Sequence, residues 1–394
     1  MKIFNKNEWK KVKLGDVFDL QMGKTPLREN KLYWDKGEYH WISISDMNFS
    51  EKYISSTKEK ITELAVKKSG IKIIPKNTVI MSFKLSIGKV KIVNEDIYSN
   101  EAIMAFIPKT NNFIDENFLY YSLKGVRWNE GINKAVKGLT LNKALISQKE
   151  IFLPNLAIQK EIASNLDSIA DFLDLRRKQL NYLEELSKSL FTTMFGDIKT
   201  NNKNWEIVKL EKYINIIGGY AFKNIDFKST GIPLIRIGNI NSGQFKSTNL
   251  VFIKENKKFE KFKVFPNDIL ISLTGTVGKD DYGNACILGN SYSEYYLNQR
   301  NAKIEIIDKI NKNFFLEIIK IKEVKKKLTG ISRGIRQANI SNKDIYNLSI
   351  PLPPIELQNK FAERIEKIEK LKFTIWKIIL KVYKILKKKG VESN

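Results

Sequence analysis

The sequence predicts an α+β protein made of two tandem copies of one unit, each a mixed α/β domain followed by a long α-helix. Two observations support this fold class. A set of landmark motifs occurs twice in the same order, with a period of roughly 196 residues. Residues 156–195 and 355–389 contain neither glycine nor proline, although the chain has 21 glycines and 9 prolines. The length of 394 residues fits two or three domains.

The duplication is visible from the start of each copy. Trp9-Lys-Lys-Val-Lys-Leu14 returns as Trp205-Glu-Ile-Val-Lys-Leu210. The later landmarks recur in the same order: Gly23 at Gly219, 41–47 at 234–240, 78–82 and 87–89 at 268–272 and 277–279, Asn100-Glu101 at Asn298-Gln299, and 153–159 at 352–358. Small loop insertions would explain why the number of residues between matched segments varies along the chain. We therefore interpret the two halves as copies of one fold.

The first part of each copy is expected to contain both strands and helices. Short apolar runs such as 79–81 and 269–271 lie between clusters of Gly, Asn, Asp and Ser, a pattern typical of strands joined by turns. Apolar helical stretches at 117–123 and 314–321 are interleaved with them. This pattern favours α+β over an all-β domain.

The second part of each copy is predicted to be a long helix. Pro154 and Pro353-Pro354 precede the two helices, and Gly196 and Gly390 follow them, as expected for helix boundaries. Apolar residues repeat in alternating steps of four and three, which is typical of a coiled-coil seam. The predicted seam consists of Leu166, Ile169, Leu173, Leu180, Leu183, Leu190, Met194, Phe361, Ile365, Ile368, Ile375, Ile379, Val382 and Leu386. We expect the two helices to bury this seam against each other; the alternative is that each packs only on its own domain.

The charge balance points to a polyanionic partner. The chain has 68 Lys and Arg against 43 Asp and Glu, a net charge of +25, and a pI near 9.7. Nucleic acid suits this excess, because each phosphate that a cation neutralises releases a counterion. The alternative is a membrane-surface or scaffold protein, whose basic helix at residues 373–389 would lie on anionic lipid.

The residue content argues against a catalytic or metal site. The single histidine, His40, excludes zinc sites with two or three histidines, and the single cysteine, Cys286, excludes an internal disulfide framework. Gly23-Lys24-Thr25 resembles the end of a phosphate-binding P-loop, but Phe18 stands where its first glycine is required. The Asn/Asp-Pro-Pro-aromatic motif of an adenine methyltransferase is absent from the sequence. These features agree with a protein that is not an enzyme; a fused nuclease or methyltransferase is the remaining enzyme alternative, and the missing motifs argue against it.

The sequence also predicts a cytoplasmic protein. Residues 1–12 are too charged for a signal peptide, and no run of 18 apolar residues could span a bilayer. One cysteine fits a reducing compartment.

The landmarks together resemble the specificity subunit of type I DNA restriction-modification enzymes. The resemblance rests on the Trp-x-x-Val-x-Leu-x-Asp pattern at 9–16, the Ile-Gly-Lys segment at 87–89 and the Leu-Pro-Pro-Ile-Glu-Leu-Gln segment at 352–358, and it covers nearly the whole chain. The sequence departs from the pattern at Lys212, where the second copy lacks the counterpart of Asp16, and at Asn155 and Ala157 in the first helix start.

This resemblance implies a fold and a function. Residues 1–153 and 198–353 would be two target-recognition domains, the latter with its linker, and 154–197 and 354–394 would be two long helices. The helices would pair as an antiparallel coiled coil with pseudo-twofold symmetry. The subunit would read a bipartite target in double-stranded DNA and recruit two modification subunits and the restriction subunits. No cofactor is expected in this chain; S-adenosylmethionine, ATP and Mg would bind the partner subunits.

Three loop regions recur in both copies and are expected to contact DNA, because recognition needs Arg, Lys, Asn or Gln for base edges and cations for phosphates. The first follows the opening strand, the second surrounds the Gly-Lys segment, and the third precedes the long helix. Arg236 and Arg300 are added because they replace Ser43 and a neutral residue in otherwise apolar frames. The candidates are Lys24, Thr25, Arg28, Lys84, Ser86, Lys89, Lys137, Thr140, Tyr220, Lys223, Arg236, Thr274, Thr276, Lys279, Arg300, Arg333, Arg336 and Gln337.

Overall fold

The computed structural model describes residues 9–84, 86–110, 113–128, 141–330 and 337–388. The chain forms two compact units. The first unit comprises Met1–Arg177 and Lys377–Asn394, and the second comprises Lys178–Trp376. Each unit therefore contains one copy of the mixed domain and parts of both long helices.

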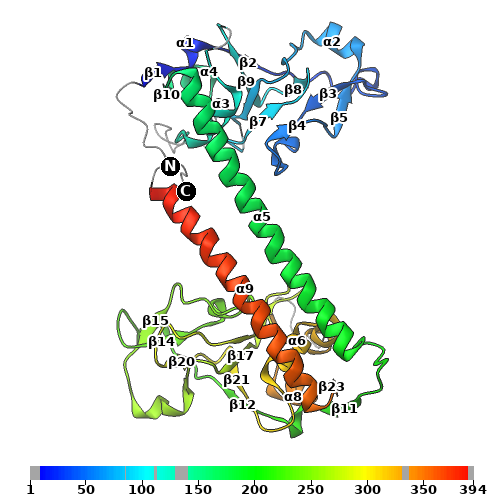
Figure 1. Ribbon diagram of the computed structural model, residues 1–394, viewed down its shortest axis with the longest axis vertical. Helices are drawn as coiled ribbons and strands as arrows, with labels where there is room; N and C mark the ends of the chain where they lie inside the picture. Colours follow the sequence, from blue (N-terminus) through cyan, green and yellow to red (C-terminus); the bar gives the residue numbers. More distant parts are fainter. Residues whose placement is uncertain (1–8, 85, 111–112, 129–140, 331–336, 389–394) are drawn as a thin grey trace. The chain divides into compact units, whose positions relative to one another are not determined.

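The described part of the first unit contains three sheets and four short helices, which Figure 1 labels. Its largest sheet has the order β2 (Phe18–Met22), β9 (Ile103–Pro108), β6 (Val79–Ser82), β7 (Val90–Val93), β4 (Tyr53–Ile54). A second sheet has the order β5 (Glu59–Ile61), β3 (Tyr39–Ile42), β8 (Tyr98–Ser99), and β1 (Lys10–Lys13) pairs with β10 (Glu150–Leu153). The helices are α1 (Leu14–Val17), α2 (Glu63–Ser69), α3 (Glu116–Gly125) and α4 (Lys143–Gln148), with 3-10 turns η2 (Lys31–Tyr33) and η3 (Asp46–Asn48).

The second unit repeats this arrangement with additions. One sheet has the order β12 (Ile214–Gly218), β21 (Asn301–Ile306), β17 (Ile269–Ser272), β19 (Ala285–Ile287), and another the order β13 (Phe227–Lys228), β15 (Val251–Ile253), β14 (Ile232–Ile235), β20 (Tyr295–Leu297), β16 (Lys263–Val264). Two further pairs are β11 (Glu206–Lys209) with β23 (Ser349–Leu352) and β18 (Thr274–Thr276) with β22 (Gln337–Asn339). The short helices are α6 (Lys312–Lys320), α7 (Lys322–Thr329) and α8 (Asn342–Tyr346), with 3-10 turns η4 (Leu210–Lys212), η5 (Asn224–Asp226), η6 (Ile237–Asn239) and η7 (Lys257–Phe262).

The duplication extends to strand register. In the first unit β3 pairs in parallel with β8, with Trp41 opposite Tyr98. In the second unit β14 pairs in parallel with β20, with Leu234 opposite Tyr296. Trp41 and Leu234 are the first residues of the matched sequence segments 41–47 and 234–240, so these segments begin at equivalent strand positions. The predicted α+β class and the two copies of one fold are confirmed.

The structure shows that one of the predicted matches between the two copies was wrong. Gly88-Lys89 was aligned with Gly278-Lys279, but the equivalent residues are Gly283 and Asn284. The amides of Gly88 and Gly283 donate to the carbonyls of Ser82 and Ser272, and both glycines have a positive φ. The cause is a longer hairpin in the second unit, where residues 273–282 replace residues 83–87.

The two long helices form where the sequence predicts them, because neither glycine nor proline interrupts them. The first, α5, spans Leu156–Phe195 and ends at Gly196, which has a φ of 81°. The second, α9, spans Ile355–Lys388, so the predicted stop at Gly390 lies outside the described residues.

A buried glutamine anchors the start of each long helix. In α5, Gln159 accepts from the amide of Asp115 and donates to the carbonyls of Phe113 and Pro154. In α9, Gln358 accepts from Asn311 and donates to the carbonyls of Lys309 and Pro353. Both side chains are fully buried. These contacts explain why the Leu-Pro landmark ends in glutamine in both copies.

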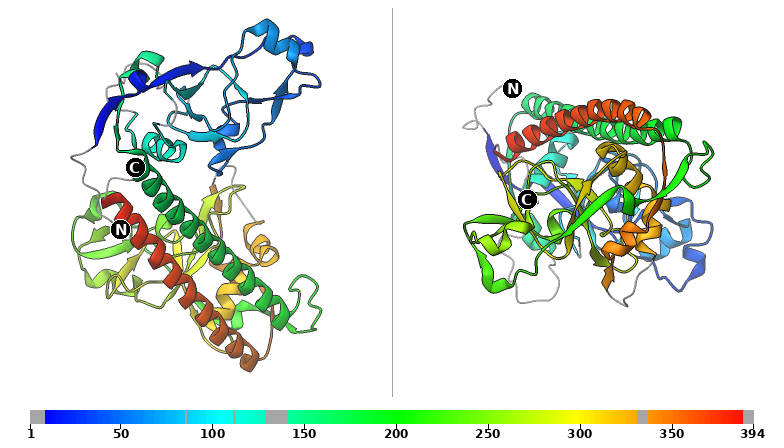
Figure 2. Two further views of the ribbon diagram at one scale, coloured as in Figure 1. Left: turned by 45° about the horizontal axis from the view of Figure 1, so that its top comes forward. Right: turned by 90° about the horizontal axis from the view of Figure 1, so that it is seen from below.

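Within each unit, part of α5 contacts part of α9 in antiparallel order (Figures 1 and 2). In the second unit, Phe361 packs on Phe191 and Phe195 with ring centroids 5.5 and 5.1 Å apart, and Lys372 pairs with Glu184 at 2.5 Å. In the first unit, Arg177 donates to the hydroxyl of Tyr383. Residues later in α5 therefore contact residues earlier in α9, which agrees with the antiparallel pairing expected from the resemblance.

The predicted seam positions differ in burial. Leu173, Phe361, Ile365, Ile368, Ile375, Ile379 and Leu386 are buried, while Leu166, Ile169, Leu180, Leu183, Leu190, Met194 and Val382 are partly buried. Phe191 and Phe195 are buried beside them and join the core of the second unit. Among the described residues, neither long helix has a stretch apolar enough to cross a bilayer.

Candidate nucleic-acid interface

In each unit the predicted loops converge on one short turn that connects two sheets. The first turn, residues 100–102, links β8 to β9, and the second turn, residues 298–300, links β20 to β21. Each begins with an asparagine whose side-chain oxygen accepts from the amide two residues later, at 3.0 Å for Asn100 and 3.5 Å for Asn298. Each is also bonded to the end of the neighbouring parallel strand, from Asn100 to Ile42 and from Asn298 to Ile235.

The first predicted loop packs directly on this turn. The amide of Lys24 donates to the Ser99 carbonyl at 2.8 Å, and that of Tyr220 donates to the Leu297 carbonyl at 2.9 Å. The residues before them are Gly23 and Gly219, where a Cβ atom would collide with the turn's backbone carbonyls. Glycine is required at both positions because the two backbones approach so closely.

The second and third loops reach the same turn through one residue in each unit. The amide of Phe83 donates to the Ala102 carbonyl at 3.0 Å, and that of Leu273 donates to the Arg300 carbonyl at 2.9 Å. The carbonyls of Phe83 and Leu273 in turn accept from Leu141 and Ile340, which lie after the third predicted loop. The first and second loops, and a residue that follows the third, therefore meet at one place in the described part of each unit.

In the first unit, the predicted residues surround Glu101. The Thr25 hydroxyl donates to its carboxylate. Burial alone would raise the pKa of Glu101, but this hydrogen bond and the charges of Lys84 and Arg28 lower it below its usual value. Thr25, Arg28 and Lys84 are thus brought together around a carboxylate that was not among the predicted site residues.

Some predicted cations of the first unit are already engaged within the protein. Arg28 forms a bidentate ion pair with Glu59, and its Cζ atom lies 3.9 Å from the ring centroid of Trp34. Lys89 donates to the side-chain oxygen of Asn48. Lys24 is exposed, and Ser86 is partly buried. Arg28 and Lys89 must exchange these contacts if they bind phosphate.

In the second unit, Thr274, Thr276 and Arg300 line one open pocket of about 300 Å³. The carboxylate of Asp281 accepts from both the amide and the hydroxyl of Thr276, at 2.8 and 3.0 Å. These bonds lower the pKa of Asp281, with that from the Thr276 amide contributing most. Asn241 and Ile237 complete the lining. Three predicted residues, Thr274, Thr276 and Arg300, therefore share a concave surface, while Lys279 and Arg236 do not line it.

The remaining predicted residues are spread around this pocket or lie elsewhere. Tyr220 belongs to an aromatic cluster, 4.9 Å from both Phe222 and Phe259. Arg236 is partly buried and donates to the Asn249 carbonyl at 2.8 Å. Lys223 and Lys279 have exposed side chains. Lys137, Thr140, Arg333 and Arg336 lie outside the described residues, and Gln337 is described only as part of β22.

Two positioning contacts of the second unit were missed by the sequence reasoning. Lys325 on α7 pairs with Asp280 and donates to Asn284 at 2.5 Å. Asn284 donates to the Asn241 carbonyl at 2.6 Å. Lys325 has 11% of its side chain exposed. Its contacts hold the long hairpin loop beside the pocket; a lysine in a helical run of lysines gave no signal of this role.

The surroundings of His40 and Cys286 indicate structural roles for both residues. His40 Nδ1 lies 2.9 Å from the Thr57 hydroxyl, and Nε2 lies 3.5 Å from Glu95. The Thr57 hydroxyl donates to the Glu59 carbonyl, so Nδ1 must donate to Thr57 and cannot activate it as a nucleophile. Cys286 is buried, and burial raises the pKa of its thiol to about 12. The described residues contain no cluster of three or more metal-ligating side chains.

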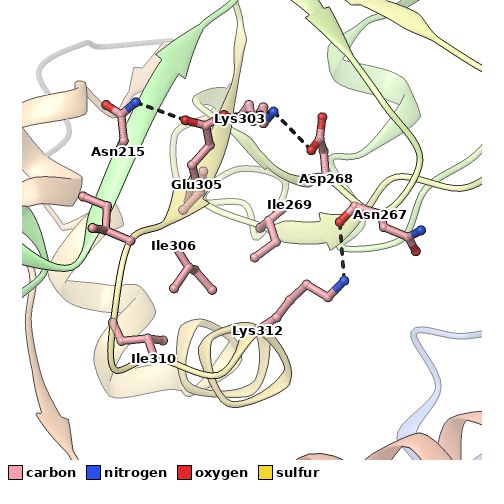
Figure 3. A pocket seen from close by; sticks show the side chains of 11 residues that line it. Asn215, Asn267, Asp268, Ile269, Lys303, Glu305, Ile306, Ile310 and Lys312 are labelled. Atoms are coloured by element: carbon pink, nitrogen blue, oxygen red, sulfur yellow. Dashed lines mark hydrogen bonds and ion pairs between the residues drawn. The ribbon is translucent and has the colours of Figure 1, made fainter.

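A larger groove of about 820 Å³ lies against the outer sheet of the second unit (Figure 3). Lys303 bridges Asp268 and Glu305 at 3.2 and 3.0 Å, and Lys312 donates to the Asn267 carbonyl at 3.4 Å. None of the predicted DNA-contact residues lines it. Both of its carboxylates, Asp268 and Glu305, pair with Lys303.

Known proteins resemble this chain over most of its length. The chain matches the type I restriction modification DNA specificity domain twice, over residues 6–185 and 202–382. It is 25% identical over 390 residues to the specificity subunit of the type I restriction enzyme MjaVIII of Methanocaldococcus jannaschii, covering 92% of this chain and 87% of that protein. It is 26% identical over 289 residues to the EcoBI specificity subunit of Escherichia coli, covering 64% and 59%.

Solved structures show the same fold. The S subunit of a type I restriction-modification system from M. genitalium has a TM-score of 0.59 at 17% identity, and the match covers 100% of this chain and 98% of that chain. The two domain matches include residues of both long helices and give no support to the alternative of a membrane-surface or scaffold protein. The chain belongs to the family of type I restriction-modification specificity subunits and is a DNA target-recognition subunit that is not itself catalytic.

Proposed function

We propose that this subunit reads a bipartite target in double-stranded DNA, one half with each recognition domain. The first domain would comprise residues 1–153 and the second 198–353, with 154–197 and 354–394 forming the helical segments. The observation that carries this proposal is the convergence of the predicted loops on one turn in each unit. Because each unit has its own complete set, each can read DNA separately.

The contacts would combine phosphate and base recognition. The net charge of +25 supports binding to the phosphate backbone. In the second domain, Arg300, Thr274 and Thr276 on a concave surface are suited to base edges, while exposed Lys223 and Lys279 are suited to phosphates. In the first domain, Lys24, Lys84 and the Glu101 cluster would take these roles. The predicted residues outside the described part remain candidates of the third loop.

The partners would be two modification subunits and the restriction subunits. The modification subunits would bind S-adenosylmethionine and methylate adenine, and the restriction subunits would use ATP and Mg. The helices offer a docking surface, because Tyr182, Leu186, Leu371 and Trp376 are large apolar residues with 51–67% of their surface exposed. Exposed apolar groups of this size are typical of protein interfaces.

We further propose that the two helices set the length of the unread spacer between the half-targets. Both helices are long, at 40 and 34 residues, and they contact each other in antiparallel order within each unit. A helix rises about 1.5 Å per residue and resists compression through its backbone hydrogen bonds. A paired helix of this length can act as a ruler.

Sequencing of methylated bases in host DNA tests the proposal. We compare a host that contains this chain with one from which it is deleted, and with one in which residues 1–153 come from another specificity subunit. The expected result is a bipartite motif that disappears on deletion and changes in one half in the chimera. A chimera that changes both halves, or neither, would contradict the assignment of one half-target to each domain.

A further inference from the structure

The centre of the turn differs in chemistry between the two domains although its backbone is the same. Glu101 occupies this position in the first turn and Gln299 in the second, and both are exposed. The loop and hairpin bonds on either side agree to within about 0.1 Å: Lys24 to Ser99 at 2.8 Å and Tyr220 to Leu297 at 2.9 Å, Phe83 to Ala102 at 3.0 Å and Leu273 to Arg300 at 2.9 Å. The fold therefore presents two different side chains from one rigid position.

Glu101 is a carboxylate in an otherwise cationic setting. Thr25 donates to its Oε2 atom, and Lys84 and Arg28 help to keep its pKa below the usual value, although burial opposes this. The group is therefore ionised at neutral pH and can only accept hydrogen bonds. A carboxylate repels phosphate, so its presence at the centre of a DNA-facing surface suits a base edge rather than the backbone.

Gln299 is neutral and sits between polar and cationic neighbours. The backbone amide of Gln299 donates to the Tyr220 carbonyl at 2.9 Å, and this bond fixes the backbone at Gln299. The next residue, Arg300, is exposed and lines the pocket with Thr274 and Thr276. A glutamine amide offers one donor and one acceptor side by side. This pair matches the N6 amino group and N7 of adenine in the major groove.

We propose that Glu101 and Gln299 are specificity-determining residues, with Glu101 accepting a hydrogen bond from the N4 amino group of a cytosine in the first half-target and Gln299 pairing with N6 and N7 of an adenine in the second. The inference rests on the proposed reading of one half-target by each domain. Cytosine is assigned to Glu101 because its major-groove edge offers an amino donor without an adjacent acceptor, whereas adenine offers both.

The experiment uses the complete chain in complex with its modification subunit and a pool of random-sequence double-stranded DNA. Bound DNA is sequenced for the wild type and for Glu101→Gln, Glu101→Ala and Gln299→Glu. Glu63→Gln is the matched control, since Glu63 lies on α2 with 62% of its side chain exposed and pairs with Lys67. Thermal unfolding of each variant is measured in parallel. Glu101→Gln keeps the shape of the side chain and an oxygen to accept from Thr25.

We expect Glu101→Gln to reduce the preference for cytosine at one position of one half-target by roughly ten- to a hundredfold, in favour of adenine. Glu101→Ala should abolish the preference at that position without changing the others. Gln299→Glu should shift one position of the other half-target from adenine to cytosine. Glu63→Gln should select the wild-type motif.

Two failures are distinguishable. If the wild-type complex selects no bipartite motif, the proposed function fails and this inference fails with it. If the wild type selects such a motif and Glu101→Gln selects it unchanged, the inference alone is overturned. A lower unfolding temperature for Glu101→Gln with an unchanged motif would identify Glu101 as a structural partner of Thr25, which also overturns it.

Discussion

In the first recognition domain the hairpin between β6 and β7 closes over residues 83–89, whereas in the second the hairpin between β17 and β19 extends over 273–284 and adds β18, which pairs with β22. The core beneath them differs as well. Lys91 is buried in the first hairpin and donates to the Phe49 and Glu51 carbonyls, while the equivalent residue in the second is the apolar Cys286. The two hairpins nevertheless meet the turn through the same backbone bond.

This comparison separates what is copied from what has diverged. The copied features are backbone contacts and the side chains that enforce them, such as Gly23 and Gly219 at the turn and Gln159 and Gln358 at the helix starts. The diverged features are side chains and loop lengths at the surface that we propose to face DNA. Equal effects are therefore expected from equivalent changes in the copied set, and unequal effects elsewhere.

The largest effect is expected from insertions in the helix pair that joins the two copies. Four residues inserted between Arg176 and Arg177 add about 6 Å of helix and rotate the seam by only about 40°. Because DNA rises about 3.4 Å per base pair, the unread spacer should lengthen by one to two base pairs. Two inserted residues rotate the seam by about 200° and should prevent pairing and abolish recognition.

The measurement is the methylated motif of each insertion variant in host DNA. The four-residue variant should keep both half-targets and change only their spacing. If it keeps the wild-type spacing, another feature sets the distance between the half-targets. Recognition by the two-residue variant at wild-type strength would contradict the pairing of the seam.

The helix-start glutamines should contribute equally in the two domains. Gln159→Leu and Gln358→Leu each remove a fully buried side chain that accepts one and donates two hydrogen bonds to backbone groups, which should cost about 3 kcal/mol or more. Urea unfolding of each variant measures this loss. Gln148→Leu, at an exposed glutamine on α4, serves as the control for the same change. A loss of under about 0.5 kcal/mol in either buried variant would show that water replaces the missing partners.

The sequence predicted the parts of the fold that depend on local physics. The long helices were predictable from the absence of glycine and proline, and the two copies from the order of landmarks. The hairpin register was not, because Gly278-Lys279 reproduces the local pattern of Gly88-Lys89 while five extra residues displace it from the equivalent position. Local similarity cannot distinguish a copied glycine from a new one in an inserted loop.

The sequence predicted which loops lie together better than it predicted the contacts that their side chains make. The loops of Thr25 and Lys84 and those of Thr274 and Arg300 converge as a site requires. Glu101 was noted only as a landmark, because a carboxylate in a basic protein gives no signal for DNA contact. Arg28 was selected for its charge, but its pairing with Glu59 depends on a strand that is distant in sequence. Tertiary pairing of charges cannot be read from residue type.

The two turn glycines offer a second test of equality between the domains. A Cβ at Gly23 would meet the Ser99 and Asn100 carbonyls, and a Cβ at Gly219 would meet those of Leu297 and Asn298. Gly23→Ala and Gly219→Ala should each destabilise the chain by about 1–3 kcal/mol, because backbone atoms on both sides must move. Each should also weaken recognition of its own half-target only. Gly125→Ala is the control, since a Cβ there meets no atom within 4 Å.

Thermal or urea unfolding gives the stability of these glycine variants, and selection from random DNA gives the half-target affected. Equal losses would support a copied backbone at the turn. A loss confined to Gly23→Ala would show that the longer hairpin of the second domain lets its turn yield.

The smallest effect is expected at a pair in the second unit, Glu184 with Lys372, which fills a polar position of the helix seam. Burial raises the pKa of Glu184, but the hydrogen bond and charge of Lys372 outweigh it and hold the pKa below the usual value. A carboxyl group whose pKa is lower in the folded state stabilises the fold above its unfolded pKa, and this contribution is lost as the pH falls through the folded pKa. Glu184→Gln should therefore be less stable than the wild type at pH 7 and equal to it in acid.

The difference at pH 7 should be at most about 1 kcal/mol, because 47% of the Glu184 side chain is exposed and water screens the pair. Urea unfolding between pH 7 and pH 3, with Glu185→Gln as the control on the exposed neighbouring residue, measures it. A deficit of Glu184→Gln that persists unchanged at the acid end would assign its effect to shape and not to charge.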